Sequence, residues 1–373
     1  MLVGCPKEIK KAERRVGLTP TSVRELVAHG HEVIIERGAG LGIGANDDAY
    51  WAAGAKTVDT AEEIWSRAEL IVKVKEPQTV ERSLLSEDQV LFTYLHLAPD
   101  PDQTADLVAS GATCVAYETV TDNGGGLPLL APMSQVAGRM SIQAAAHCLE
   151  APNQGAGLLL GGVPGVKAAN VVVIGGGVVG EHAIQMAAGL GAEVAVLDRN
   201  ITVLNRLARH FGTALQTVYS TSSAVEEWVL DADVVIGAVL VKGDRAPKLV
   251  SAGLVRQMRP GSVLVDVAID QGGCFETSKP TTHEEPTYVV DDVVHYCVAN
   301  MPGAVPRTST FALNNATLPF TLALADKGAK QALLDDPNFL GGLNVCKGTI
   351  TEEHVAGALG YEYVPPEKAL ESC

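Results

Sequence analysis

The sequence lacks the features of several protein classes. It has no basic excess, because 28 lysine and arginine residues face 44 aspartate and glutamate residues, for a formal net charge of −16. A nucleic-acid partner needs a basic face, so this balance argues against one. No apolar run reaches the length of about 18 residues that marks a membrane helix. The N-terminus meets charges by Lys7 without the apolar stretch of a signal peptide.

Metal-binding cysteine patterns are also missing. The seven cysteines form no CxxC pair, and no group of histidine and cysteine has the spacing of a zinc site, so no metal is predicted. An odd number of cysteines in a long chain favours reduced thiols in a cytoplasmic protein. Cys373, the last residue, is expected to be exposed and reactive. No tract is of low complexity, so little disorder is expected.

What the chain does contain is a regular alternation of short apolar runs and helical patterns. Its 373 residues, 47% of them hydrophobic, are enough for about two domains. LVGCP, EVIIE, ELIVKVK, VLFTYLHL and TCVAYE are predicted strands, and TPTSVRELVAHG is a predicted helix with Thr19 as its N-cap and Gly30 at its end. A second series of strands begins near residue 170 with NVVVIGG, EVAVLD, DVVIGAVL and SVLVDVAI. This alternation predicts α/β domains with parallel strands.

After residue 300 the pattern changes. Pro302, Pro306 and Pro319 are expected to break this segment into a loop and a helix that return the chain to the first domain. The predicted architecture is two doubly wound Rossmann-like domains with a cleft between them. The first is expected to comprise residues 1–129 and 307–373, and the second residues 130–306.

A glycine-rich turn near residue 175 carries the strongest motif. In VVVIGGGVVG, Gly175, Gly177 and Gly180 fit the pattern G-x-G-x-x-G, which follows an apolar strand and opens a helix. The three glycines are expected to permit the tight turn, the approach of a pyrophosphate and the packing of the helix, in that order. The helix N-terminus offers N–H groups to phosphates. The sequence therefore predicts a dinucleotide site; the alternative is a glycine turn that only packs tightly.

The residue that ends the next strand, EVAVLD, bears on the choice of cofactor. Asp198 can accept hydrogen bonds from ribose hydroxyls and would repel a 2′-phosphate, which favours NAD over NADP. Arg199 argues the other way, because an arginine here can accommodate a 2′-phosphate. The strand-end place belongs to Asp198, so NAD is the predicted cofactor.

Two polar side chains end strands of the first domain. His96 closes LFTYLHL, where a satisfied core histidine is the usual case, but α/β domains place ligands at this strand edge and histidine moves protons near neutral pH. Lys75, in KVKEPQ, could hold a carboxylate or carbonyl oxygen. From this stretch alone a solvated strand end is the better interpretation of Lys75, and the neighbouring Lys73 shows how ordinary such a lysine is.

Two further places remain open from the residues alone. SVLVDVAID is predicted to be a buried strand ending at Asp270, near where a nicotinamide should lie, while Asp266 within the run could be structural. In KEIKKAERRVGLTP, either Arg14 or Arg15 could offer a bidentate fork to a carboxylate, or the segment could be a solvated charged loop.

These motifs together resemble the alanine dehydrogenase family, relatives of the nucleotide-binding subunit of transhydrogenase. The resemblance runs through VGCPKEIK, VKVKEPQ, VLFTYLHLA, LPLLAPMSQVAGRMS, VVVIGGGVVG, VDVAIDQGGCFETSKPTTHEEPTY and VVHYCVANMPGAVPRTST, and it extends nearly to the end of the chain. It implies reversible oxidation of L-alanine to pyruvate and ammonium with NAD, in a cytoplasmic homohexamer.

The resemblance also implies domain and residue roles: the first domain binds the substrate and the second binds NAD. It places substrate binding at Arg15 and Lys75, and acid–base chemistry at His96 and Asp270. Besides the glycine turn, it places NAD contacts at Ser134, Val178, Val179, Asp198, Ser220, Val239, Leu240, Val267, Ala268, Ile269, Asp270, Lys279, Val298, Ala299, Asn300 and Met301.

The sequence departs from the family pattern at two positions. Val203 stands where several relatives carry a basic residue, which affects an adenosine-side contact, and Val218 stands where an arginine is frequent. Three other functions are compatible with parts of the pattern: a transhydrogenase subunit that passes hydride to a protein partner, an amino-acid dehydrogenase of another specificity, and a non-catalytic NAD-binding protein. His96 in TYLHLA and the PMSQVAGRM tract resemble the dehydrogenase versions and argue against the transhydrogenase subunit. The match is closer to alanine dehydrogenase than to an amino-acid dehydrogenase of another specificity. The presence of all four candidate catalytic and substrate residues argues against the non-catalytic protein.

Overall fold

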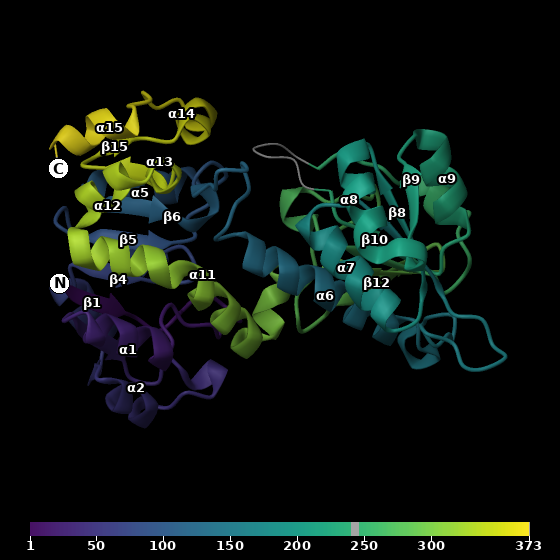
Figure 1. Ribbon diagram of the computed structural model, residues 1–373, viewed down its shortest axis with the longest axis horizontal. Helices are drawn as coiled ribbons and strands as arrows, with labels where there is room; N and C mark the ends of the chain where they lie inside the picture. Colours follow the sequence, from purple (N-terminus) through teal and green to yellow (C-terminus); the bar gives the residue numbers. More distant parts are fainter. Residues whose placement is uncertain (240–245, 373) are drawn as a thin grey trace. The chain divides into compact units, whose positions relative to one another are not determined.

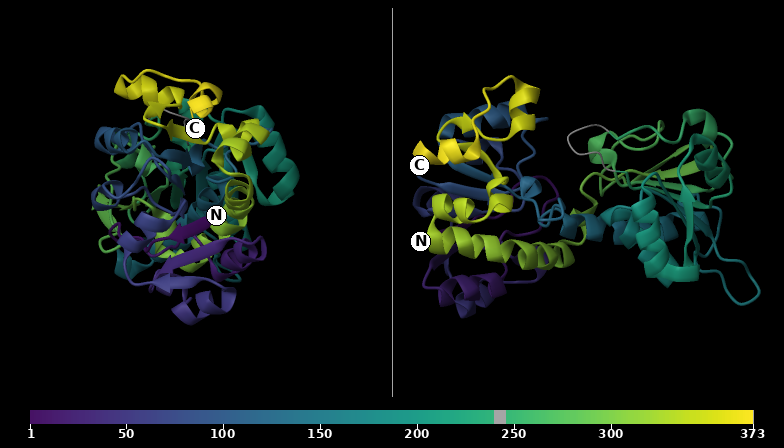
Figure 2. Two further views of the ribbon diagram at one scale, coloured as in Figure 1. Left: turned by 90° about the vertical axis from the view of Figure 1, so that its left-hand side faces the viewer. Right: turned by 45° about the horizontal axis from the view of Figure 1, so that its top comes forward.

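The chain forms two compact units in the computed structural model, which describes residues 1–239 and 246–372 (Figure 1). Unit 1 comprises Met1–Met133 and Val305–Cys373, and unit 2 comprises Ser134–Ala304. Both termini belong to unit 1 (Figure 2). The functional boundaries after residues 129 and 306 stay a prediction, and the predictions for Leu240 and Cys373 fall outside the described residues.

Unit 1 is built on one sheet, which has eight strands among the described residues in the order β15-β14-β6-β5-β4-β1-β2-β3. Strands β1 to β6 are parallel, whereas β14 runs antiparallel to β6 and β15 antiparallel to β14. The strands are β1 Leu2–Cys5, β2 Glu32–Glu36, β3 Lys56–Val58, β4 Leu70–Val72, β5 Val90–Thr93, β6 Thr113–Ala116, β14 Leu343–Cys346 and β15 Thr349–Ile350.

Helices cover both faces of this sheet. They are α1 Pro20–Ala28, α2 Asp47–Ala53, α3 Ala61–Arg67, α4 Thr79–Arg82, α5 Pro101–Ser110, α11 Pro306–Lys327, α12 Ala329–Asp335, α13 Pro337–Leu340, α14 Glu353–Leu359 and α15 Pro366–Ala369. Residues of α1 and α11 pack on one face of the sheet, and residues of α3, α5 and α14 pack on the other. Figure 1 shows the late helix α11 lying beside the early strands β4 and β5. The return of the chain to its first unit therefore completes the core.

Unit 2 is built on a second sheet, which has seven strands among the described residues in the order β12-β13-β11-β10-β7-β8-β9. All neighbours are parallel except the edge pair β12 and β13. The strands are β7 Asn170–Ile174, β8 Glu193–Asp198, β9 Gln216–Tyr219, β10 Val234–Gly237, β11 Val263–Asp266, β12 Thr287–Val290 and β13 Val293–Tyr296. The helices are α6 Ala131–Cys148, which begins in unit 1, α7 Val178–Gly189, α8 Ile201–Phe211, α9 Ser222–Leu230 and α10 Ala252–Val255.

The continuous apolar strands follow from burial on both faces. In β7, Val171 and Val173 belong to the core under α6, α7 and α8, whereas Val172 and Ile174 belong to the core under α9 and α10. A parallel sheet covered on both sides needs apolar residues at every position rather than at alternate ones. The predicted α/β class with two Rossmann-like sheets is confirmed.

Two details differ from the sequence-based expectation. The strands that carry candidate residues end early: β5 ends at Thr93 rather than near His96, and β11 ends at Asp266 rather than at Asp270. Pro319 lies inside α11 and does not break it. Its side of the helix is exposed, while Leu313 and other residues on the opposite face are buried in the core of unit 1. This packing outweighs the lost hydrogen bond of the proline.

Within residues 1–239 and 246–372, no helix is long and apolar enough to cross a membrane. The same residues contain no group of three or more histidine, cysteine or acidic side chains that could hold a metal ion. Cys5, Cys114, Cys148, Cys274 and Cys297 are free and buried, but Cys346 is disulfide-bonded, so the expectation that all thiols are reduced is wrong for that residue.

Candidate functional site

Three polar side chains in unit 1 follow the carboxyl ends of three neighbouring parallel strands. Lys75 comes three residues after β4, His96 three residues after β5, and Glu118 two residues after β6. Parallel strands bring their carboxyl ends to one edge of the sheet, where α/β domains bind ligands. The early strand ends therefore put these residues on the edge loops rather than on the strands.

Arg15 lies in the loop after β1 and is 2% exposed, whereas Arg14 is exposed. Its guanidinium makes a bidentate pair with Glu13, with Nε 2.7 Å from Oε1 and Nη2 2.6 Å from Oε2. Its Nη1 lies 3.0 Å from Met133 Sδ. Burial opposes ionisation of Glu13, but the hydrogen bonds and charge of Arg15 lower its pKa to about 2. Glu13 thus fixes the orientation of the charged Arg15 guanidinium through its Nε and Nη2 atoms.

Lys75 is a partly buried cation close to Arg15. Burial, and then the charge of Arg15, lower the pKa of Lys75 below its ordinary value. Arg15 lowers the pKa of Lys75 because a second cation nearby disfavours the charged ammonium, and a bound carboxylate would offset this repulsion. These residues can therefore hold a small carboxylic acid.

His96 has a left-handed backbone, with φ of 50°, which is uncommon for a residue other than glycine. Glu118 holds this conformation: its Oε1 accepts hydrogen bonds from the backbone N–H of His96 at 2.5 Å and of Leu95 at 3.1 Å. The same oxygen lies 3.6 Å from Nδ1 of the His96 ring, and the ring stacks on Tyr94. About half of the His96 side chain is exposed, so its ring can reach a ligand.

The glycine turn of unit 2 has the geometry that the motif requires. Gly175 has φ of 102°, and a Cβ atom there would lie 2.7 Å from the carbonyl oxygen of Ala238. A Cβ atom at Gly180 would lie 1.9 Å from the carbonyl oxygen of Gly175, so α7 packs on the turn only because that residue is glycine. A Cβ atom at Gly177, by contrast, would meet nothing within 4 Å. The open space at the start of α7 fits a pyrophosphate.

Asp198, the last residue of β8, is tied to the same turn. Its Oδ2 accepts a hydrogen bond from the N–H of Gly176 at 2.7 Å, and its Oδ1 accepts one from the N–H of Asn200 at 2.7 Å. Val203, one of the two departures from the family pattern, lies beside this turn, since a Cβ atom at Gly176 would be 2.7 Å from its Cγ1. The carboxylate is thus fixed beside the turn with further lone pairs for ribose hydroxyls.

Most of the other predicted cofactor contacts also follow strand ends of this sheet. Ser220 follows β9, and its backbone N–H donates a hydrogen bond to the carbonyl oxygen of Asp198 at 3.1 Å. Val239 follows β10. Residues 267–270 follow β11 and residues 298–301 follow β13. Ser134 is instead on α6, and Lys279 donates its N–H to Tyr288 Oη at 2.7 Å in the loop before β12. Since the strands concerned are parallel, their ends share one edge of the sheet.

Asp270 stands on a single 3₁₀ turn, Ile269–Gln271, and is exposed. The following loop is clamped from two sides. Asp266, fully buried, accepts hydrogen bonds from Cys274 N at 2.8 Å and Ser278 Oγ at 2.5 Å. Lys248 Nζ donates to the carbonyl oxygens of Gly272, Gly273 and Phe275. Asp266 therefore has a structural role, and the exposed carboxylate that can act chemically is Asp270.

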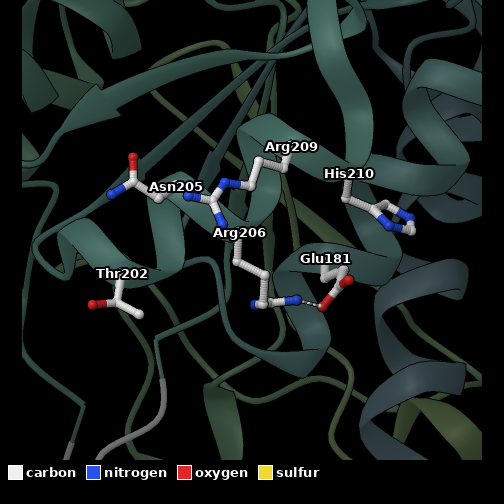
Figure 3. A pocket seen from close by; sticks show the side chains of 6 residues that line it. All are labelled: Glu181, Thr202, Asn205, Arg206, Arg209 and His210. Carbon is white, nitrogen blue, oxygen red and sulfur yellow. Dashed lines mark hydrogen bonds and ion pairs between the residues drawn. The ribbon is translucent and has the colours of Figure 1, made fainter.

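A separate pocket lies between α7 and α8. It is lined by Glu181, Thr202, Asn205, Arg206, Arg209 and His210. Figure 3 shows Arg206 and Glu181 pointing toward each other; Arg206 Nη2 also donates to the carbonyl oxygen of Gly176 at 3.1 Å. None of the predicted substrate or acid–base residues lines this pocket. Arg206 supports the glycine turn through this hydrogen bond, and the pocket is not the candidate active site.

Sequence inspection missed the residues that support the candidates. A simple pattern could have indicated two of them. Glu13 is an acid two residues before Arg15, and Glu118 is an acid two residues after the strand that neighbours the strand of His96. Lys248 gave no such signal, because it contacts the loop after Asp270 only through the fold.

Known proteins resemble this chain over nearly its whole length. Residues 4–137 match the family model "Alanine dehydrogenase/PNT, N-terminal domain", and residues 141–353 match "Alanine dehydrogenase/PNT, C-terminal domain". An alanine dehydrogenase of Halomonas elongata is 61% identical over 98% of each chain, and one of Bacillus subtilis is 52% identical over 100% of this chain and 98% of its own.

Solved structures show the same relation. An L-alanine dehydrogenase structure superposes with a TM-score of 0.94 at 53% identity, covering 96% of this chain and 99% of its own. A transhydrogenase from Sinorhizobium meliloti superposes with a TM-score of 0.80 at 24% identity, covering 95% and 99%, and shares the fold. Since both family models match and the relatives align over nearly their full lengths, the chain belongs to the alanine dehydrogenase/PNT family.

Proposed function

We propose that the chain catalyses the reversible, NAD-dependent oxidative deamination of L-alanine to pyruvate and ammonium. The observation that carries this proposal is the 61% identity to an alanine dehydrogenase across 98% of both chains. When held at the glycine turn of unit 2, NAD would supply the hydride acceptor, and the neutral amine of alanine, losing a hydride from Cα and a proton from nitrogen, would become an imine. Water then adds to that carbon and ammonia leaves, and the residues of the chain bind the substrate and move the protons.

Arg15 and Lys75 bind the substrate. Arg15 offers a rigid planar donor, already oriented by Glu13, to the carboxylate that alanine and pyruvate share. Lys75 adds a compact positive charge, which polarises the carbonyl oxygen of pyruvate in the reverse direction. The pKa of Lys75 is lowered first by burial and then by the charge of Arg15, and a substrate carboxylate beside the two cations would favour the charged ammonium.

His96 and Asp270 move the protons. Addition of water to the imine needs a proton removed from the water, and loss of ammonia needs a proton delivered to nitrogen. The left-handed backbone of His96 and its bonds to Glu118 fix where the ring can act. Asp270 is exposed on a short turn whose following loop is held by Lys248 and Asp266.

NAD binds at the strand-end edge of unit 2. The open space beside Gly177 takes the pyrophosphate, and Asp198 takes the ribose hydroxyls and excludes a 2′-phosphate. The remaining contacts are those predicted from the resemblance: Ser134, the helix start at residues 178–179, Ser220, residues 239–240, residues 267–270, Lys279 and residues 298–301. Leu240, in this set, lies outside the described residues.

The purified chain alone tests the proposal. It should reduce NAD with L-alanine and oxidise NADH with pyruvate plus ammonium, and do little with NADPH. Glycine, 2-aminobutyrate and lysine serve as comparison substrates, since one extra methylene typically changes discrimination by about 1–3 kcal/mol. A chain that binds NADH but turns over none of these acids would contradict the proposal and favour hydride exchange with a protein partner.

For assembly and location we propose a cytoplasmic homohexamer, as the family resemblance implies. Light scattering of the purified protein should then give a mass of six times 39.0 kDa. A mass of one or two chains at micromolar concentration would contradict the hexamer. Fractionation of the native host should place the activity with cytoplasmic markers.

A further inference from the structure

A fully buried ionic cluster lies directly beneath the Lys75 loop. Lys73, the first residue after β4, is 0% exposed, and its Nζ lies 3.0 Å from Glu8 Oε2 and 2.8 Å from Glu81 Oε1. The two glutamate side chains are also buried. The three residues come from the loop after β1, the end of β4 and helix α4. We refer to them as the Lys73 cluster.

Stability alone is a poor explanation for such a cluster. Removing three charges from water is costly, and replacing a buried ion group with apolar side chains of similar volume is often neutral or stabilising. Burial raises the pKa of Glu8 despite the nearby ammonium of Lys73, so the fold disfavours the ionised form of this carboxylate. A geometric role for the cluster is therefore the better interpretation.

The contacts show what the cluster holds. The second oxygen of Glu8, Oε1, accepts hydrogen bonds from the backbone N–H of Val74 at 2.6 Å and of Lys75 at 3.3 Å. The second oxygen of Glu81, Oε2, accepts one from the N–H of Gln78 at 2.7 Å. The two carboxylates thus hold the backbone on both sides of the Lys75 side chain, while Lys73 ties them to each other.

The other side of the same loop is also fixed. The carbonyl oxygen of Lys75 accepts a hydrogen bond from Thr93 Oγ1 at 3.0 Å, and the carbonyl oxygen of Lys73 accepts one from Tyr117 Oη at 2.9 Å. Within the cluster, Glu8 is the residue whose carboxylate touches the backbone N–H of Lys75 itself.

We propose that Glu8, anchored by Lys73 and Glu81, is the positioning residue for Lys75. It orients the backbone of residues 74–75 and thereby sets the direction in which the Lys75 ammonium meets the substrate. A carboxylate suits this task, because one oxygen can accept from two N–H groups while the other stays bound to the lysine. Glutamine would present an amide NH₂ to one of these positively polarised groups. This inference rests on the proposed role of Lys75 in substrate binding.

The main test is a double-mutant cycle with Glu8→Gln and Lys75→Ala. Glu8→Gln is expected to lower kcat/KM for pyruvate by about tenfold while the KM for NADH changes by less than about twofold. In the Lys75→Ala background, Glu8→Gln should add little further loss. If Glu8→Gln causes the same fold-loss in both backgrounds, it does not act through Lys75 and the proposal is overturned.

Controls separate this inference from the proposed function and from simple unfolding. Glu32→Gln removes an exposed carboxylate paired with Lys56 at 2.9 Å and should leave kcat/KM unchanged. If Lys75→Ala alone keeps the wild-type kcat/KM for pyruvate, the role of Lys75 is wrong and this inference falls with it. If Lys75→Ala lowers kcat/KM for pyruvate but Glu8→Gln does not, the proposed role of Lys75 stands and only the positioning role of Glu8 is wrong.

A second variant covers the case in which Glu8→Gln does not fold. The combination Glu8→Gln, Lys73→Met and Glu81→Gln removes all three charges and leaves no buried ion unpaired, so it is expected to fold. Its kcat/KM for pyruvate should still be reduced, because nothing anchors the side chain that contacts Val74 and Lys75. A fully neutral cluster with wild-type kcat/KM for pyruvate would overturn the proposal.

Discussion

Replacing Glu13 with glutamine is expected to destabilise unit 1 in a way that depends on pH. Burial opposes ionisation of this carboxyl, yet hydrogen bonds and charge from Arg15 lower its pKa from an ordinary 4.5 to about 2. At about 1.36 kcal/mol per pH unit, the gap between these values corresponds to roughly 3 kcal/mol of stability at neutral pH. The free energy of unfolding of the wild type should therefore be larger than that of Glu13→Gln by about this amount.

The sign of the pH dependence follows from the direction of the shift. Because the folded-state pKa of Glu13 is depressed, its contribution is complete well above pH 4.5 and is lost as the pH falls through about 2. As the pH falls, Glu13 is protonated first in the unfolded chain, where its pKa is higher. The difference in unfolding free energy between wild type and Glu13→Gln should therefore narrow by about 1 kcal/mol between pH 7 and pH 4.

Thermal unfolding at several pH values measures this gap. For a domain of about 150–250 residues, 1 kcal/mol shifts Tm by roughly 2–4 °C, so Glu13→Gln should lower the Tm of unit 1 by about 6–12 °C at pH 7. The control is Glu32→Gln, whose ion pair with Lys56 is exposed on both sides and should contribute little. A Tm difference for Glu13→Gln that is absent, or identical at pH 7 and pH 4, would refute the assignment of this stability to the pair with Arg15.

Three further outcomes concern catalysis. His96→Ala should reduce turnover by about 10²–10⁴-fold, while fluorescence titration still shows NADH binding; near-normal turnover across pH 6 to 10 would exclude His96 as the proton carrier. Asp198→Ala should lower the ratio of kcat/KM for NAD to that for NADP, and an unchanged ratio would direct attention to Arg199. Because burial and then Arg15 lower the pKa of Lys75, the KM for pyruvate should rise as pH increases through that lowered value. Lys75→Arg, which keeps its charge, should flatten this rise, and an identical pH profile for the variant would argue against Lys75 as the titrating group.

Local sequence patterns were sufficient for the general fold and for the cofactor turn. Strand and helix periodicity predicted two α/β domains, because a parallel sheet covered on both faces requires unbroken apolar strands. The positions of Gly175 and Gly180 could be predicted, since positive φ and close helix packing exclude a side chain there. Thr19 likewise caps α1, with its Oγ1 accepting from Ser22 N at 3.2 Å, as a local hydrogen bond allows.

Contacts between distant segments decided the rest. Pro319 stays within α11 because the opposite face of that helix is buried against strands more than two hundred residues earlier. Lys73 looked as ordinary as any strand-end lysine, yet the fold buries it between Glu8 and Glu81. The backbone of His96 is left-handed because Glu118, from the neighbouring strand end, accepts its N–H. A sequence window carries propensity and spacing, whereas burial and the partners of a charged group depend on which strands become neighbours, and only the tertiary structure determines that.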